Sequence, residues 1–161
     1  GGLIGVIFAS IIFAKKNNQN SFLYMDIVAL VAPIGIFFGR IANFINGELV
    51  GKITNVSWSV IFPRVDLMPR HPSQLYEAFL EGLILFFIMN FFLIRQNYKI
   101  GTCSCMFLIF YGIFRTVSEF FREPDSHIGY LFNLISTGSV LSILMIISGL
   151  MMYSFIKKNE I

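Results

Sequence analysis

Residues 22–51 read FLYMDIVALVAPIGIFFGRIANFINGELVG. The apolar part is long enough to cross a bilayer, because a helix needs about 20 apolar residues to span the hydrocarbon core. The run ends in a cluster of polar side chains: Arg40, Asn43, Asn46 and Glu48. Polar groups are costly in hydrocarbon, so such residues usually face a protein partner, a water-filled cavity or a bound head group. This stretch therefore predicts a membrane protein with a polar site at one end of a helix.

The composition of the whole chain agrees with a membrane location. Of its 161 residues, 56% are hydrophobic and 13% are charged, whereas soluble domains carry about 25% charged residues. A net charge of +3 is too small to indicate nucleic-acid binding. Cys103 and Cys105 lack the spacing of a zinc or redox pair and are expected to be small helix residues. Neither a metal-ligand set nor a Ser-His-Asp set is found, so we expect no metal and no cofactor.

The apolar runs predict an all-α polytopic helix bundle with about five spans. They cover residues 1–14, 22–46, 73–94, 102–122 and 130–156. The chain opens inside an apolar run without Met, so we expect one transmembrane domain over residues 1–161 that lacks its N-terminal part.

Residues 47–72 form the long polar connection between the second and third runs. Residues 56–62 mostly alternate apolar and polar side chains. That pattern predicts either a short strand or arm on the extracytoplasmic membrane surface, with Trp58 at head-group depth, or an ordered loop anchored by this aromatic residue.

The basic residues are sorted by type between the two predicted sides of the membrane. One side holds Lys15, Lys16, Arg95, Lys99, Lys157 and Lys158, and the other holds Arg40, Lys52, Arg64, Arg70, Arg115 and Arg122. Lysines in short loops mark the cytoplasmic side, so the arginine side is predicted to face outward.

The second apolar run carries the first candidate site. Arg40, Asn43 and Gly47 share one helical face. An arginine fork fits a phosphate, and an asparagine adds neutral hydrogen bonds; a snorkelling arginine at a helix end is the alternative. Asp26, in the same run, has two open interpretations, a cap of its own helix or an internal polar role.

The third and fourth runs add two further polar faces. The fourth presents Tyr111, Arg115, Ser118, Glu119 and Arg122, and the third presents Gln74, Glu77 and Glu81, preceded by His71. Glu119 can pair with Arg115 and with Arg122, as in a structural ion-pair ladder. Two arginines to one glutamate would leave a positive charge for an anion. A carboxylate on the face of the third run, Glu77 or Glu81, is expected to compensate an arginine of a neighbouring helix or, as the alternative, to act as an acid or base.

Three stretches resemble the signatures of bacterial prolipoprotein diacylglyceryl transferases. They are GRIANFINGELVG at 39–51, RHPSQLYE at 70–77, and YGIFR at 111–115 continuing to EFFREPD at 119–125. The opening GGLIG at 1–5 is similar to the end of the family's His-Gly-Gly motif, whose histidine would precede Gly1. Residues 135–139 lack the Met-Gly-Gln of the family's final span.

This resemblance implies a seven-span enzyme of the bacterial inner membrane, with its active site on the periplasmic side. The family transfers the diacylglyceryl group of phosphatidylglycerol to the lipobox cysteine of a prolipoprotein. By position, Arg40, Arg115 and Tyr111 would be catalytic. The phosphatidylglycerol site would comprise Arg40, Asn43, Asn46, Glu48, Gly51, Arg115, Glu119 and Arg122, with Asp26, His71, Gln74 and Glu77 as secondary candidates. The residue that takes the thiol proton is not assigned.

Two other functions fit the same residues. A non-enzymatic binder or translocator of anionic phospholipids would use the same arginines without releasing glycerol phosphate. A purely structural helix bundle would keep its function after the charges of Arg115 and Glu119 were exchanged.

Overall fold

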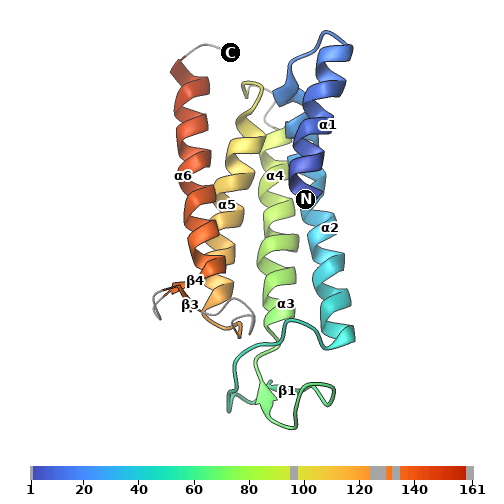
Figure 1. Ribbon diagram of the computed structural model, residues 1–161, viewed down its shortest axis with the longest axis vertical. Coiled ribbons are helices and arrows are strands. Elements are labelled where there is room, and N and C mark those ends of the chain that lie inside the picture. The colour runs from blue at the N-terminus through green and yellow to red at the C-terminus, as the bar shows by residue number, and fades with distance from the viewer. Residues whose placement is uncertain (1, 95–97, 124–129, 132–134, 159–161) are drawn as a thin grey trace.

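The computed structural model describes residues 2–94, 98–123, 130–131 and 135–158. The described helices are α1 (Gly2–Lys16), α2 (Ser21–Asn46), α3 (Ser73–Glu77), the π-helical η1 (Ala78–Ile84), α4 (Leu85–Ile94), α5 (Thr102–Glu119) and α6 (Thr137–Lys158). The segments α3, η1 and α4 follow one another without a break and form one long helix. The helices pack as an elongated bundle, and a small arm projects from one end (Figure 1).

The bundle has the surface of a membrane protein. Among the described residues, three helices are long and apolar enough to cross a bilayer: α2, the helix over Ser73–Phe92, and α6. Large apolar side chains on them are exposed, including Phe38 at 65% and Met151 at 68%. An all-α membrane fold is therefore confirmed. The five-span count stays a prediction, because α1 has 15 residues and α5, with 18 residues, is not among those three helices.

The ends of α2 follow from its flanking residues. The side chain of Asn20 accepts a hydrogen bond from the amide of Phe22 at 3.0 Å, which satisfies one of the free N–H groups at the helix start. Gly47 ends the helix with a left-handed φ of 69°, a conformation that costs glycine little. Asp26 therefore does not cap its own helix, and that interpretation was wrong.

Asp26 instead holds the start of α5. Its Oδ2 accepts from the amide of Gly101 at 2.7 Å, and its Oδ1 accepts from the amide and hydroxyl of Ser104 at 2.8 and 2.6 Å. The carboxylate is 4% exposed, and the positive end of the helix dipole favours a negative charge there. The internal polar role is confirmed, on a helix far along the chain.

Two predicted helix boundaries were wrong. The last run was expected to be helical from residue 130, but Tyr130–Leu131 (β3) pairs antiparallel with Ile135–Ser136 (β4), and α6 begins at Thr137. The fourth run was expected to continue to residue 122, but α5 ends at Glu119 because the backbone of Arg122 pairs with Gly51 of the arm. Arg95 of the predicted cytoplasmic side and residues 124–125 of the third motif lie outside the described residues.

The arm over residues 47–72 is mostly irregular. Within it Val60–Ile61 (β1) pairs antiparallel with Pro69–Arg70 (β2), so the alternating pattern of residues 56–62 becomes a strand over two residues only. Arg70 holds the arm together: it donates to Asp66, to the carbonyl of Gly51 at 2.9 Å and to Glu123. Asp66 raises the pKa of Arg70, and Arg70 lowers the pKa of Asp66.

Candidate functional site

The site is built where η1 crosses α2 at very short range. A Cβ atom on Gly82 would lie 2.6 Å from Cβ and 2.8 Å from Cα of Phe37, so a larger residue at position 82 would push the two helices apart. This glycine was not among the predicted site residues. Its role depends on the distance between helices, which the spacing of polar residues does not reveal.

The close approach brings an arginine of α2 onto two glutamates of the neighbouring helix. Arg40 Nη1 lies 2.9 Å from Glu77 Oε2, and Nη2 lies 3.1 Å from Glu81 Oε2. Both glutamates are fully buried, while the side chain of Arg40 is 15% exposed. A π-helical segment of this kind is rare and often occurs at functional sites. Glu81 was placed on this helical face from the sequence but was left out of the predicted site.

Helix α5 brings a second arginine to the same two carboxylates. Arg115 Nη1 lies 2.6 Å from Glu77 Oε1 and 3.6 Å from Glu81 Oε1, and Nη2 lies 2.8 Å from Glu119 Oε2. The predicted pairing of Arg115 with Glu119 is thus confirmed, as is the compensating role of Glu77. Arg122 joins the cluster with Nη1 at 3.7 Å from Glu77 Oε1.

The charge balance of the cluster differs from the prediction. Helix α5 alone suggested one uncompensated positive charge, but Glu77 and Glu81 of the neighbouring helix face the same guanidinium groups. The described cluster therefore contains three arginines (40, 115, 122) and three glutamates (77, 81, 119). Its formal charge is zero, because burying unpaired charges would be very costly.

The members of the cluster differ in burial. The side chains of Glu77 and Glu81 are 0% exposed, whereas those of Arg40 and Arg115 are 15% and 12% exposed. Glu119 and Arg122 are exposed to a similar extent, 10% and 8%. Glu77 and Glu81 are therefore the most deeply buried members of the cluster.

The start of α6 reaches the third glutamate. A Cβ atom on Gly138 would lie 2.7 Å from Glu119 Oε1, so glycine lets this carboxylate come close to the N-terminal end of α6. A helix N-terminus favours a negative charge. This contact gives the segment over residues 135–139, which departs from the family motif, a structural role.

Four residues of the first motif lie around the cluster without joining the described ion pairs. Asn43 is half-buried, and Asn46 and Glu48 are exposed. The carbonyl of Glu48 accepts from Gln74 Nε2 at 2.6 Å, which places Gln74 in a structural contact with the arm. Gly51 is buried where the arm pairs through its backbone with Arg122, just after the end of α5.

Tyr111 lies one helical turn from Arg115 on α5. Its ring stacks on Phe107, with centroids 5.6 Å apart and planes 13° apart. Because i and i+4 side chains share a helix face, Tyr111 lines the cluster on the side of the apolar core. That core contains Ala29, Leu85, Met89 and the buried, unpaired Cys103.

His71 belongs to a separate aromatic cleft of about 470 Å³. The cleft is lined by Trp58, His71, Tyr76, Phe79, Leu80 and Phe121. The hydroxyl of Tyr76 accepts from Trp58 Nε1 at 2.7 Å and lies 3.3 Å from His71 Nδ1. Trp58 is 61% exposed, which is compatible with both the surface strand and the anchored loop predicted from the sequence. The depth of Trp58 in the membrane stays a prediction.

Fold and site together define a helical membrane protein with a neutral cluster of arginines and glutamates where its helices meet a surface arm. A sequence model of the family described as prolipoprotein diacylglyceryl transferase matches residues 1–155. The chain belongs to this family.

Relatives with the name phosphatidylglycerol–prolipoprotein diacylglyceryl transferase are about half identical to the chain. The protein of Rickettsia bellii (strain OSU 85-389) is 53% identical over 152 residues, which is 93% of this chain and 58% of that protein. The protein of Aeromonas hydrophila is also 53% identical over 152 residues, covering 94% of this chain and 55% of that protein. The chain thus spans little more than half the length of these relatives.

Proposed function

We propose that the protein of which this chain is part transfers the diacylglyceryl group of phosphatidylglycerol to the lipobox cysteine thiol of a prolipoprotein. Family membership and the names of the relatives support this reaction. The observation that carries it is the convergence of Arg40 from α2 and Arg115 from α5 on one pair of buried glutamates.

In this reaction the thiol loses its proton to a base, and its sulfur forms a bond to the glyceryl carbon that bears the phosphate. The carbon–oxygen bond breaks, and its electron pair leaves with glycerol phosphate. The phosphodiester of the lipid carries one negative charge, while the released monoester carries between one and two at neutral pH. The need for positive charge therefore grows along the reaction.

The two arginines are suited to supply that charge. Fixed donors that stabilise charge developing in the transition state accelerate a reaction more than donors that bind the substrate equally well. Glu77 and Glu81 would hold Arg40 and Arg115 in place from beneath. The phosphate would approach the partly exposed faces of the guanidinium groups, and an arginine fork matches its geometry.

We further propose that the protein lies in the bacterial inner membrane with the arm and the arginine cluster toward the periplasm. The lysine-rich ends of α1 and α6 would then face the cytoplasm. An impermeant maleimide should label Arg64→Cys of the arm in intact spheroplasts but label Lys158→Cys only after permeabilisation. The reverse pattern would overturn this orientation.

The transfer reaction is tested with the full-length protein, labelled phosphatidylglycerol and a lipobox peptide. Arg40→Ala is expected to lower kcat/KM by about 100-fold or more, and Arg40→Lys should restore part of the loss. Arg64→Ala is the matched control, because Arg64 lies at the same end of the bundle. Within the described part of the chain its side chain makes one hydrogen bond, to the backbone carbonyl of Asn46 at 3.4 Å.

Two results would contradict the proposal. Normal turnover by Arg40→Ala would remove the assigned role of this arginine. Binding of anionic lipid by the unchanged protein without release of glycerol phosphate would favour a phospholipid binder or translocator instead.

A further inference from the structure

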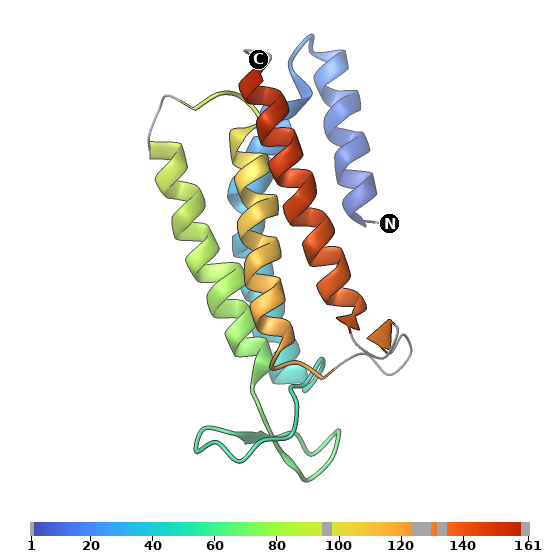
Figure 2. The ribbon, with the colours of Figure 1, turned by 90° about the vertical axis from the view of Figure 1, so that its left-hand side faces the viewer.

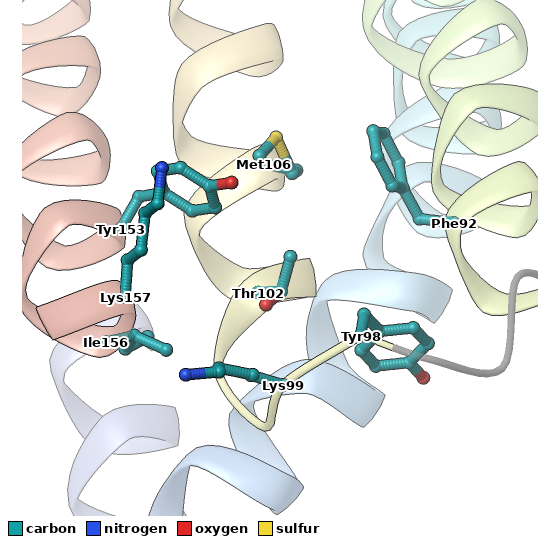
Figure 3. Close-up of a pocket in the computed structure, with 8 residues that line it drawn as sticks. All are labelled: Phe92, Tyr98, Lys99, Thr102, Met106, Tyr153, Ile156 and Lys157. Carbon is teal, nitrogen blue, oxygen red and sulfur yellow. The ribbon is translucent and has the colours of Figure 1, made fainter. Parts of the chain in front are cut away.

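A second pocket lies at the end of the bundle opposite the arm, among α4, α5 and α6. Its volume is about 420 Å³. The lining residues are Phe92, Tyr98, Lys99, Thr102, Met106, Tyr153, Ile156 and Lys157. Helix α5 runs between α4 and α6 (Figure 2), and Thr102 and Met106 of α5 lie between the α6 residues and Phe92 (Figure 3). The proposed transfer site uses none of these residues.

The lining changes from polar to apolar along the helices. Lys99 and Thr102 lie at the end of the bundle where α5 begins. Met106 lies one helical turn further in than Thr102, about 5–6 Å along the axis. Phe92 of α4 faces the same space from the other side (Figure 3). Lys99 and Thr102 thus lie at the open end of the pocket, and the Lys157 side chain reaches further in, beside Tyr153 and level with Met106 (Figure 3). Charged groups next to an apolar wall match a molecule with a charged head and a hydrocarbon tail.

Two ammonium groups give the pocket a positive charge. Lys99 extends from the loop before α5 toward α6, and Lys157 runs back along α6 toward Tyr153 (Figure 3). Within the described residues, no ion pair joins either lysine to a carboxylate. Asp26, a buried carboxylate at this end, is bonded to the start of α5.

We propose that this pocket binds one anionic phospholipid from the leaflet on the lysine side of the membrane. Its phosphate would lie between Lys99 and Lys157, and one acyl chain would lie against Phe92 and Met106. Basic pockets between membrane helices commonly bind anionic head groups. The proposal requires that the helices lie in a bilayer, and it does not depend on the transfer reaction.

The test uses the full-length protein in phosphatidylcholine nanodiscs with a small fraction of photoactivatable phosphatidic acid. This lipid is anionic and is not the proposed diacylglyceryl donor. We expect crosslinks on peptides of α4, α5 and α6 that line the pocket. The double variant Lys99→Gln/Lys157→Gln should weaken this labelling about 30-fold, which corresponds to about 2 kcal/mol.

Matched variants separate the pocket from general surface charge. Lys15→Gln/Lys16→Gln removes two exposed lysines at the end of α1 on the same side and should leave the labelling unchanged. Met106→Trp fills the apolar part and should reduce it with both lysines present. The unfolding temperature, measured on the same samples, shows whether each variant is folded.

Several outcomes would overturn the proposal. Equal labelling by photoactivatable phosphatidylcholine would mean that the pocket does not select charge. Competition by inorganic phosphate alone would indicate a free-anion site. Crosslinking of the Met106→Cys variant, through its new thiol, to another segment of the full-length chain would show that protein, and not lipid, fills the pocket.

Discussion

Replacing Gly51 by alanine should loosen the arm from the bundle. Gly51 pairs with Arg122 near the end of α5, and its carbonyl accepts from Arg70 Nη1 at 2.9 Å. An added Cβ would lie 2.8 Å from Cβ of His71, 2.9 Å from the carbonyl oxygen of Phe121, and closer still to the carbonyl oxygen of His71. Two of these three atoms belong to backbone that cannot turn aside as a flexible side chain can.

The expected loss of stability follows from these contacts. Forcing an extra methyl group into a packed site costs about 1–3 kcal/mol. Moving the arm would also weaken one hydrogen bond or more across the junction, such as that from the amide of Lys52 to Phe121 at 2.9 Å, each worth about 1 kcal/mol. The sum is about 2–4 kcal/mol, or a decrease in Tm of about 4–16 °C for a protein of a few hundred residues.

Gly47 supplies the control, four residues earlier in the chain. A Cβ there meets only Cδ1 of Phe62 at 3.7 Å, an ordinary contact, but the φ of +69° is left-handed. Gly47→Ala should therefore cost about 1–2 kcal/mol from backbone strain alone, and Gly47→Asn should cost less. Thermal unfolding of the full-length protein in detergent ranks the three variants. If Gly51→Ala melted above Gly47→Ala, steric contact at the arm junction would not limit stability.

Three other changes have defined outcomes. Glu81→Gln leaves the buried cluster with one excess positive charge. In the proposed transfer reaction, the full-length protein should therefore be inhibited by glycerol phosphate at about tenfold lower concentration, and its unfolding temperature should fall. Arg70 lowers the pKa of Asp66 from its ordinary value of 3.8. This ion pair therefore stabilises the arm fully above pH 3.8, and the stabilisation is lost as the pH falls through the lowered pKa. Tryptophan fluorescence should report the loosening of the arm, and Asp66→Asn should abolish the dependence of this fluorescence on pH. Asp26→Asn places either an NH2 group or an uncharged oxygen opposite the amide of Gly101, which now donates to the carboxylate. The hydrogen bond is lost or weakened, so the unfolding free energy measured by chemical denaturation should fall by about 2–3 kcal/mol.

The helix positions could be predicted where local signals agree with hydrophobic length. The second run was expected over 22–46 and α2 covers Ser21–Asn46, because Asn20 and Gly47 mark its two ends. The third run was expected over 73–94 and is helical throughout, with Pro72 before its first residue. The prediction for the start of the last run failed because Tyr130–Leu131 and Ile135–Ser136 belong to an apolar run but pair with each other as strands β3 and β4.

The sequence predicts which helix faces carry the polar side chains of the site, but it does not predict which arginine pairs with which glutamate. Spacing placed Arg40, Glu77 and Arg115 on polar faces, and the expectation that Glu77 compensates an arginine was correct. Which glutamate meets which arginine depends on how closely the helices pack. Gly82 sets that distance, and nothing in the local sequence distinguishes it from other helix glycines.

If the proposed transfer takes place at this cluster, its neutrality would affect turnover as well as stability. A site with three uncompensated arginines would bind phosphatidylglycerol well, but it would bind the more negative glycerol phosphate even better and release it slowly. Glu77 and Glu81 are completely buried, so their charges offset the arginines without blocking the accessible side. The guanidinium groups then remain oriented for a phosphate, while the net field on the product is reduced. Since catalysis requires stronger interaction with the transition state than with substrate or product, buried carboxylates beneath the arginines would favour turnover over tight binding in the proposed reaction.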